Sequence, residues 1–392
     1  MSELKKEVIE KAVFVFDSYK SDARIDIISK IPGQPSSFEL KVSADENYPI
    51  KFAYQYGDGL VAIEKINTKR ASNILGEFLK INNDFEKYDE FFQNYGFLFK
   101  IPTDRFARID PVQIMRISQR LKCLVDLINE VNNYNNEDYR KMMELSLFLF
   151  FDEGWNIQID KDEIQSPKYE LAELINTDAF NQICETINRQ EEINLGYFLI
   201  KDTLLNSYKL NATEYHEIVD GYSNKPGYDD FKFKAITYLY ANYKNHDNKA
   251  REIIDLLFHY YRELGIPSKI DSDHVTYFTR FKSGKMDNYF IDGIYDFAKY
   301  IIKQEIDSNI SKIHPVYNED EMRPDWKVDS LLSAMYFSLF YLDSKNEMLR
   351  HCEHCDRYFV VKRSSSTKKY CDSYCRNNAQ QAKHRIRLKN SK

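Results

Sequence analysis

The sequence is poor in residues that interrupt regular secondary structure, with only 12 glycines and 10 prolines among 392 residues. Their scarcity favours helices joined by short connections. A long hydrophobic run near the start of the chain is also missing. The apolar stretch there runs only from Ala12 to Phe16 and ends at Asp17. So short a stretch is not enough for a signal peptide or a membrane span. We therefore expect a cytoplasmic protein with no membrane partner.

The common sequence motifs of catalysis are absent as well. The chain has no glycine-rich phosphate loop, no His-Glu-x-x-His and no Gly-x-Ser-x-Gly. His216, His246 and His274 lie beside carboxylates, but no nucleophile or metal-ligand spacing accompanies them. The acidic run 318–321 is typical of a solvated loop. We assign no catalytic residue and expect no enzyme, although an active site hidden in the central region stays open.

What the sequence does have is a group of cysteines near its end. Four of the six form two close pairs, Cys352 with Cys355 and Cys371 with Cys375. Zn²⁺ prefers four soft ligands in a tetrahedron, and two such pairs supply all of them. No position is then left for a catalytic water, so the spacing predicts a structural Zn²⁺ site.

Other interpretations of these cysteines remain. Two disulfides or four unrelated buried thiols would use the same residues, but a reducing cytoplasm favours metal ligands. His351 and His354 flank the first pair and could each replace a cysteine. The aromatic residues Tyr358, Phe359 and Tyr370 would cover the metal and give a small unit its core.

The residues after Cys375 contain no glycine or proline and predict a helix. Cys375, Ala379, Ala382 and Ile386 recur at helical spacing and form a narrow apolar stripe that could lie against the finger. A helix whose first turn holds the last two zinc ligands is the layout of a treble-clef finger.

Charge is distributed unevenly along the chain. Residues 350–392 contain 12 Lys and Arg against 3 Asp and Glu, a net charge of +9, whereas the remainder carries −15. A zinc ion held by four thiolates has a net charge of about −2, which Arg357, Lys369 or Arg376 could neutralise. About +7 is left, and it suggests contact with a polyanion or with the acidic body itself.

The basic helix has the side chains that nucleic-acid recognition uses. Lys and Arg neutralise phosphates, and Arg, Asn and Gln can contact base edges. The candidates for phosphate contact are Lys383, Arg385, Arg387 and Lys389. The candidates for base contact are Arg376, Asn377 and Gln380. Alternatively, this helix is a solvated end that rests on the acidic body.

These residues also resemble a known group. Cys-x-x-Cys, an aromatic strand, Lys-Tyr-Cys, Cys-x-Asn and a basic tail are similar to the CGNR-type zinc finger at the end of many bacterial proteins. The similarity begins upstream at Asp325-Trp326-Lys327 and the run 330–342. Some members are taken to be transcription regulators, so the resemblance implies a zinc finger and a regulatory role. Here Cys375-Arg376-Asn377-Asn378 replaces Cys-Gly-Asn-Arg, so no role of that Gly or Arg carries over.

The rest of the chain predicts a mainly α protein with a small β-rich N-terminal region, an α+β class. We divide it into a β-rich region 1–68, a helical body 69–345 and a zinc-finger module 346–392. Within the first region, strands 50–56 and 60–63 flank a Gly-Asp-Gly turn, and 38–42 is expected to pair with them. A short strand is expected at 157–159. Helices are expected over 74–79, 85–95, from 110, and over 145–151, 169–187, 229–264, 291–306 and 330–342.

The helix at 330–342 is apolar on nearly all sides and is expected to be buried just before the finger. A polar connector bounded by Pro315 and Pro324 precedes it, and Cys123 and Cys184 are expected to be buried thiols. The sequence therefore favours a DNA-binding regulator that uses its basic C-terminal helix. The alternative is a non-enzymatic protein-interaction module with a structural zinc finger. The oligomeric state does not follow from the sequence.

Overall fold

The computed structural model describes residues 3–29, 37–65, 73–81, 84–133, 139–176, 210, 212–222, 224–227, 230–242, 247–278, 288–319, 322–343, 346–365 and 367–390. They form helices and small antiparallel sheets, an α+β organisation. The chain divides into two compact units. Unit 1 comprises Met1–Val125, Gly154–Pro167 and Gln304–Lys392, and unit 2 comprises Asp126–Glu153 and Lys168–Lys303.

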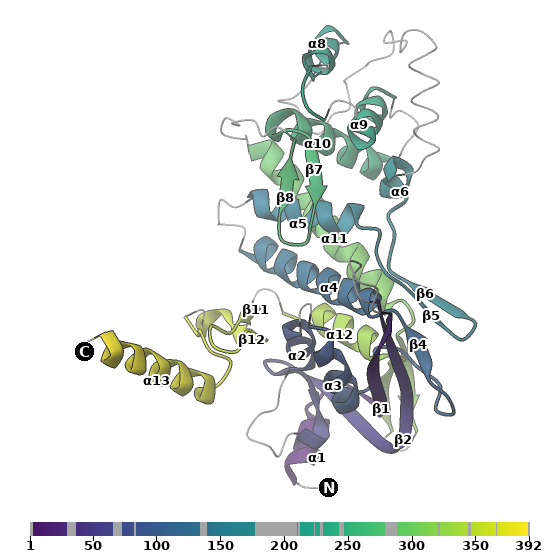
Figure 1. Cartoon of the computed structure of the whole chain (residues 1–392), viewed down its shortest axis with the longest axis vertical. Helices are drawn as coiled ribbons and strands as arrows, with labels where there is room; N and C mark the ends of the chain where they lie inside the picture. The colour runs from purple at the N-terminus through teal and green to yellow at the C-terminus, as the bar shows by residue number, and fades with distance from the viewer. Residues whose placement is uncertain are drawn as a thin grey trace. The chain divides into compact units, whose positions relative to one another are not determined.

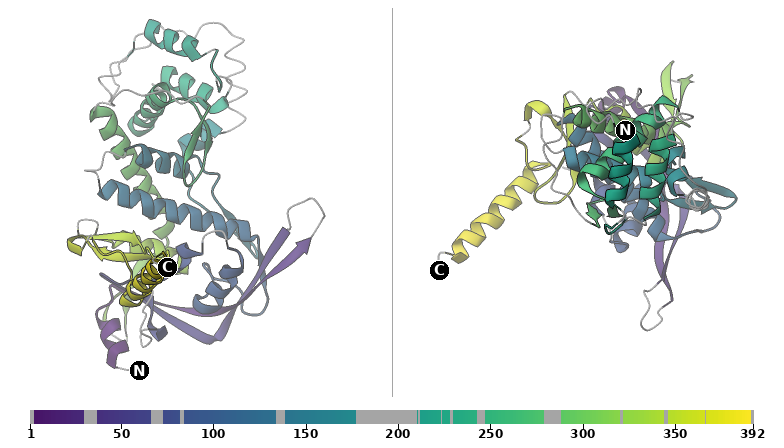
Figure 2. Two further views of the ribbon diagram at one scale, coloured as in Figure 1. Left: turned by 60° about the vertical axis from the view of Figure 1, so that its left-hand side comes forward. Right: turned by 90° about the horizontal axis from the view of Figure 1, so that it is seen from above.

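The largest sheet belongs to unit 1 and is built around strand β2 (Ser37–Gln55). Strand β1 (Phe14–Ser29) pairs with it antiparallel along nearly its whole length, and Figure 2 shows the two as one long ribbon. Strands β3 (Gly59–Ala62) and β4 (Ala107–Ile109) pair with the two ends of β2. Opposite partners Phe16 and Phe52 stack with ring centroids 4.8 Å apart. Buried rings of this kind anchor the ribbon to the core.

The sequence predicted part of this sheet. The turn at 57–59 and the strands beside it are confirmed. The segment 38–42, however, is the first part of β2 itself and pairs with β1. Strand β1 was not predicted, because charged residues such as Asp17, Lys20 and Arg24 interrupt its apolar pattern on the exposed face.

Helices cover the core of unit 1. They begin with α1 (Glu3–Glu10), α2 (Ile74–Lys80), α3 (Glu86–Tyr95) and α4 (Pro111–Asn132). The predicted start of α4 is confirmed, because the Asp110 carboxylate accepts a hydrogen bond from the N–H of Val112 at 2.9 Å. The predicted apolar face of α2 is buried, and Cys123 is buried in α4.

An ion pair lies inside this core. Arg120 of α4 and Glu305 of α11 (Asn288–Ile310) are both fully buried. Arg120 Nε donates to Glu305 Oε2 at 3.0 Å and Nη2 donates to Oε1 at 2.5 Å. The two parallel bonds give the pair a fixed geometry. The carboxylate therefore holds the end of α11 that belongs to unit 1, from Gln304 onward, against Arg120.

The segment after α11 leads towards the cysteines. The expected polar connector is instead a hairpin of β9 (His314–Asn318) and β10 (Arg323–Lys327). Pro315 and Pro324 are tolerated there because the two strands are short and exposed. Helix α12 (Leu331–Phe340) follows and is buried as predicted, apart from exposed Phe340. In the part of the chain that the structure describes, no helix is long and apolar enough to cross a membrane.

The predicted strand at 157–159 is confirmed in unit 1. It is part of β5 (Asn156–Ile159), which forms a hairpin with β6 (Asp162–Gln165).

Unit 2 is rich in packed aromatic rings. Tyr240 and Phe258, for example, stack with centroids 4.0 Å apart. The helices and strands that lie wholly within it are α5 (Tyr139–Phe151), α6 (Glu170–Asn176), α8 (Ala212–Tyr222), α9 (Phe231–Asn242), α10 (Asn248–Leu264), β7 (Pro267–Ile270) and β8 (Val275–Tyr277). It also contains the end of α4 and most of α11.

One prediction for this unit needs revision, and another is described only in part. The single helix expected over 229–264 is two helices, since Asp247 caps a new one through the N–H of Ala250. The helix expected over 169–187 is described only to Asn176, so its remainder, with Cys184, lies outside the described residues.

Candidate metal centre

The first cysteine pair lies in the turn of a short hairpin. Strand β11 (Glu347–His351) pairs antiparallel with β12 (Tyr358–Lys362), and Cys352 and Cys355 lie between them. The turn is closed by backbone bonds, because the N–H of Cys352 donates to Arg357 O at 2.9 Å and the N–H of Asp356 donates to Cys352 O at 3.0 Å. Both thiols therefore project from one rigid loop.

The second pair lies at the start of the last helix, α13 (Ser373–Asn390). Figure 1 shows this helix following the β11–β12 hairpin. Cys371 precedes it and Cys375 lies in its first turn, so only one of the two ligands predicted for that turn is helical. The Asp372 carboxylate accepts a hydrogen bond from the N–H of Cys375 at 2.7 Å, which fixes where the helix begins.

These local structures bring the four sulfur atoms together. All of them lie within 4.8 Å of one another, with Cys355 and Cys371 3.7 Å apart and Cys371 and Cys375 3.5 Å apart. Four thiolates at about 2.3 Å from one tetrahedral ion would be about 3.8 Å apart. The donor set therefore fits a single metal ion, and the four cysteines could hold one.

The other interpretations of the cysteines fit less well. A disulfide needs sulfur atoms about 2.05 Å apart, and the four residues are thiols. Neither neighbouring histidine belongs to the cluster found among the described residues. Instead, His351 Nδ1 faces the Asp356 carboxylate at 3.8 Å, and its ring meets that of Tyr358 edge-on.

The Cys352 sulfur is surrounded by backbone N–H groups. That of Cys371 lies 3.4 Å from it. Burial raises the pKa of the Cys352 thiol, but the N–H groups of Cys371, His354 and Cys355 together outweigh burial and lower this pKa to about 7. The protein thus favours a thiolate at this position.

The second pair behaves in the opposite way. Burial and the neighbouring sulfur atoms raise the pKa of Cys371, and burial raises the pKa of Cys375 to about 12. Crowded thiols resist losing their protons, whereas a divalent cation among them reverses the sign of this effect. The arrangement is therefore better suited to a cation than to four ionised sulfurs alone.

A small core surrounds the cluster. Cys352, Cys375, Phe359 and Val361 are buried together, and Tyr370 packs against them. Phe359 and Tyr370 were predicted to cover the metal and lie in or against this core. Tyr358 is buried next to His351 instead, because neighbouring residues of a strand face opposite sides.

The module is attached to helix α2 of the same unit. Arg357 Nη2 lies 2.7 Å from Glu77 Oε1, and the two side chains are only 12% and 18% exposed. Beside them the backbone of α2 touches β12 so closely that a Cβ on Gly76 would lie 1.9 Å from Tyr358 O. The position of the finger is therefore fixed by contacts that sequence spacing does not reveal.

The predicted nucleic-acid contacts all belong to α13. Arg376, Asn377, Gln380, Lys383 and Arg385 are exposed along it. Among the described side chains, none of the cations Arg376, Lys383 and Arg385 of this helix forms an ion pair. Arg387 and Lys389 lie in the same helix, but their side chains are outside the described set.

The expected apolar stripe does not continue along this helix. Cys375 is buried and Ala379 is partly buried, but Ala382 is exposed and Ile386 is 58% exposed. The finger covers only the first turns of α13, because the helix extends past the end of the hairpin. The stripe therefore has no role in packing the finger beyond Ala379.

The histidines that lie beside carboxylates form no site in the described structure. His216 and His274 are exposed, and His246 lies outside the described residues.

A comparison with protein-family models finds a match that covers part of the chain. Residues 303–384 match the model of a Family of unknown function (DUF6076). The matched region runs from the end of α11 through the β9–β10 hairpin, α12 and the cysteine hairpin into α13. No curated protein and no solved structure matches the chain. The match therefore groups the buried helix with the cysteine module and gives no activity.

Proposed function

We propose that the four cysteines bind one structural zinc ion in a treble-clef-like, CGNR-type finger, and that this finger positions α13 for contact with DNA. Sets of four thiolates suit zinc or iron, and zinc takes no part in redox chemistry. All four corners of the tetrahedron are occupied by sulfur, so the ion serves structure only. In this proposal residues 346–392 form the DNA-binding module, and the regions 1–68 and 69–345 are the scaffold to which it is attached.

The observation that carries the proposal is the exposed polar surface of α13. Arg376, Gln380 and Lys383 follow one another at the spacing of a single helix face. Arg376 and Lys383 form no ion pair with the described carboxylates, although the charge of Lys383 helps to lower the pKa of nearby Glu353. Most of their charge is therefore available to a polyanion. The side chains of Asn377 and Arg385 are also exposed, but nine residues after Arg376 the helix places Arg385 on the opposite side from this row.

The dimensions of the helix suit a DNA groove. Its 18 residues give a rod about 27 Å long. The major groove is about 12 Å wide and admits one α-helix. In this arrangement Lys383, Arg385, Arg387 and Lys389 neutralise phosphates, and Arg376, Asn377 and Gln380 face base edges.

The salt dependence of binding tests this proposal. Each phosphate contact contributes about 0.9 to the slope of log affinity against log salt. Changing Lys383, Arg385 and Arg387 to Ala should therefore reduce the slope by about 3 in a filter-binding assay. Lys161→Ala, an exposed cation in the β5–β6 turn, is the control and should leave the slope unchanged. A flat salt response of the wild-type protein would overturn the proposal.

The second candidate is a non-enzymatic protein-interaction module. The exposed apolar residues Ala382 and Ile386 on α13 favour it, since a partner could cover them. Ile386→Ser separates the two functions. Loss of a protein partner with DNA retention intact would support the interaction module, and the opposite result would support DNA binding.

A further inference from the structure

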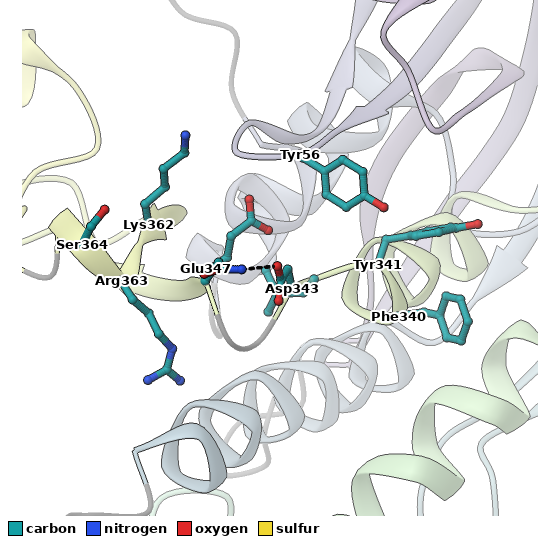
Figure 3. Close-up of a pocket in the computed structure, with 10 residues that line it drawn as sticks. Tyr56, Phe340, Tyr341, Asp343, Glu347, Lys362, Arg363 and Ser364 are labelled. Carbon is teal, nitrogen blue, oxygen red and sulfur yellow. Dashed lines mark hydrogen bonds between the residues drawn. The ribbon is translucent and has the colours of Figure 1, made fainter.

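A cavity of about 780 Å³ lies in unit 1 between the end of α12 and the β11–β12 hairpin (Figure 3). Its volume is within the range of sites for small molecules, about 300–1,000 Å³. The residues that line it include aromatic rings, carboxylates and cations. This cavity is separate from the four cysteines.

Glu347 is the most informative residue of the lining. It opens strand β11, its side chain is only 5% exposed, and its Oε2 has no hydrogen-bond partner among the described residues. Lys362 is its cross-strand neighbour, but Figure 3 shows the Lys362 ammonium pointing away from the carboxylate. A buried acceptor without a donor is unfavourable, so a ligand hydroxyl that donates to Oε2 would gain affinity.

The backbone explains why this carboxylate stays in place. The backbone of Asp343 and that of Gly57, in the turn between β2 and β3, both hydrogen-bond to the Glu347 carboxylate. Burial nevertheless raises the pKa of Glu347.

The groups that line the cavity follow a definite order. Figure 3 shows Tyr56, Tyr341 and Phe340 on one side, the carboxylates in the middle and the cations on the other side. Tyr56 and Tyr341 meet edge-on with centroids 6.5 Å apart, and Phe340 and Tyr341 do so at 5.2 Å. The order is therefore aromatic, acidic, basic.

We propose that this cavity binds a ribonucleotide. The base packs on Tyr56 and Tyr341, a ribose hydroxyl donates to Glu347 Oε2, and the phosphate meets Lys362 and Arg363. Bases stack on aromatic side chains, carboxylates accept hydrogen bonds from ribose hydroxyls, and Lys and Arg bind phosphate. Base, ribose and phosphate have the same order as the three groups in the cavity.

Other ligand classes match this order less well. An organic cation would suit the rings and carboxylates, but Lys362 and Arg363 would repel it. A compact polyanion would suit the cations, but Asp343 and Glu347 would repel it. Lys362 is exposed, and its flexible stem allows the ammonium to turn to a phosphate. The proposal does not depend on DNA contact by α13.

Calorimetry with the full-length, metal-bound protein and AMP or GMP tests the proposal. Tyr56→Ala should weaken AMP binding about tenfold or more, because it removes a stacking surface. Tyr317→Ala is the matched control, since both tyrosines are 58% exposed and Tyr317 lies outside the cavity. It should change the affinity less than about twofold.

A second comparison tests the ribose contact. Replacing AMP by 2′-deoxy-AMP or by 3′-deoxy-AMP removes one ribose hydroxyl. At least one of these two analogues should bind more weakly than AMP to the wild-type protein. In the Glu347→Gln variant the same analogue should bind about as well as AMP. No AMP or GMP binding at about 1 mM, or equal losses in the two tyrosine variants, would overturn the proposal.

The source of the nucleotide is a separate question. If a short single-stranded RNA competes with AMP at equal concentrations of chain ends, a terminal nucleotide is the ligand. If only mononucleotides compete with AMP, the ligand is a free nucleotide. Changing Lys383, Arg385 and Arg387 to Ala should leave the affinity for AMP unchanged. The nucleotide proposal and the DNA-binding proposal can therefore fail independently of each other.

Discussion

Arg357, in the loop that holds the first cysteine pair, lies 2.7 Å from Glu77 on helix α2, and both side chains are largely shielded from water. The pair joins two segments that are 280 residues apart in the sequence. A charge left in such a place without its partner is destabilising. The contact therefore fixes the cysteine hairpin on the helices of its unit.

Arg357→Met should lower the free energy of unfolding of unit 1 by about 2 kcal/mol, because Glu77 then loses a charge-assisted hydrogen bond. It should also speed the release of metal to a chelator. Lys369→Met is the control: it breaks an ion pair with Glu353 in the same module, but that pair is exposed to water. Equal effects of the two substitutions would contradict the role of Arg357.

Gly76→Ala should destabilise the same junction by about 1–3 kcal/mol, because its Cβ would collide with Tyr358 O. The usual effect of this change inside a helix is stabilising, by up to about 1 kcal/mol. Gly221→Ala in α8 is the matched control, since no atom lies within 4 Å of the added Cβ. Thermal unfolding and metal release should separate the two, and a stabilised Gly76→Ala variant would exclude the close approach.

Asp230 predicts a pH effect in unit 2. It caps α9 through the N–H of Phe233 at 3.0 Å, and burial raises its pKa above the usual 3.8. A raised carboxyl pKa means that the charged form weakens the folded state at every pH above the folded pKa. This loss is relieved as the pH falls from the folded pKa towards 3.8.

Asp230→Asn keeps a good cap and removes the charge. It should stabilise unit 2 at pH 7, and the gain should shrink as the pH is lowered towards 3.8. Unfolding in denaturant at several pH values measures this. Asp247→Asn, the same substitution at the exposed cap of α10, separates loss of a cap from loss of a buried charge. A gain for Asp230→Asn that does not change with pH would contradict the interpretation.

The sequence was most informative where the determining residues are close together. Two short Cys-to-Cys spacings bring four sulfurs to one place because each pair lies in a single turn. The sequence signals that predicted the buried helix α12 and the start of α4 also lie within a few neighbouring residues. Strand β1 and the β9–β10 hairpin were missed, since exposed strands carry charges and prolines that hide the alternation of apolar residues.

Features that join distant segments could not be predicted. Nothing in the sequence around Glu77 or Gly76 indicates a contact with a loop about 280 residues later. Glu347 is an isolated carboxylate in a short strand, and only the fold shows that one of its oxygens is buried without a donor. These contacts depend on tertiary packing, which local patterns do not encode.

The metal content of the purified full-length protein tests the central claim most directly. Elemental analysis should find one zinc per chain, a greatly reduced content in Cys352→Ser, and an unchanged content in Cys123→Ser, whose thiol lies outside the cluster. A wild-type protein without bound metal, or a Cys352→Ser variant with as much zinc as the wild type, would contradict the account.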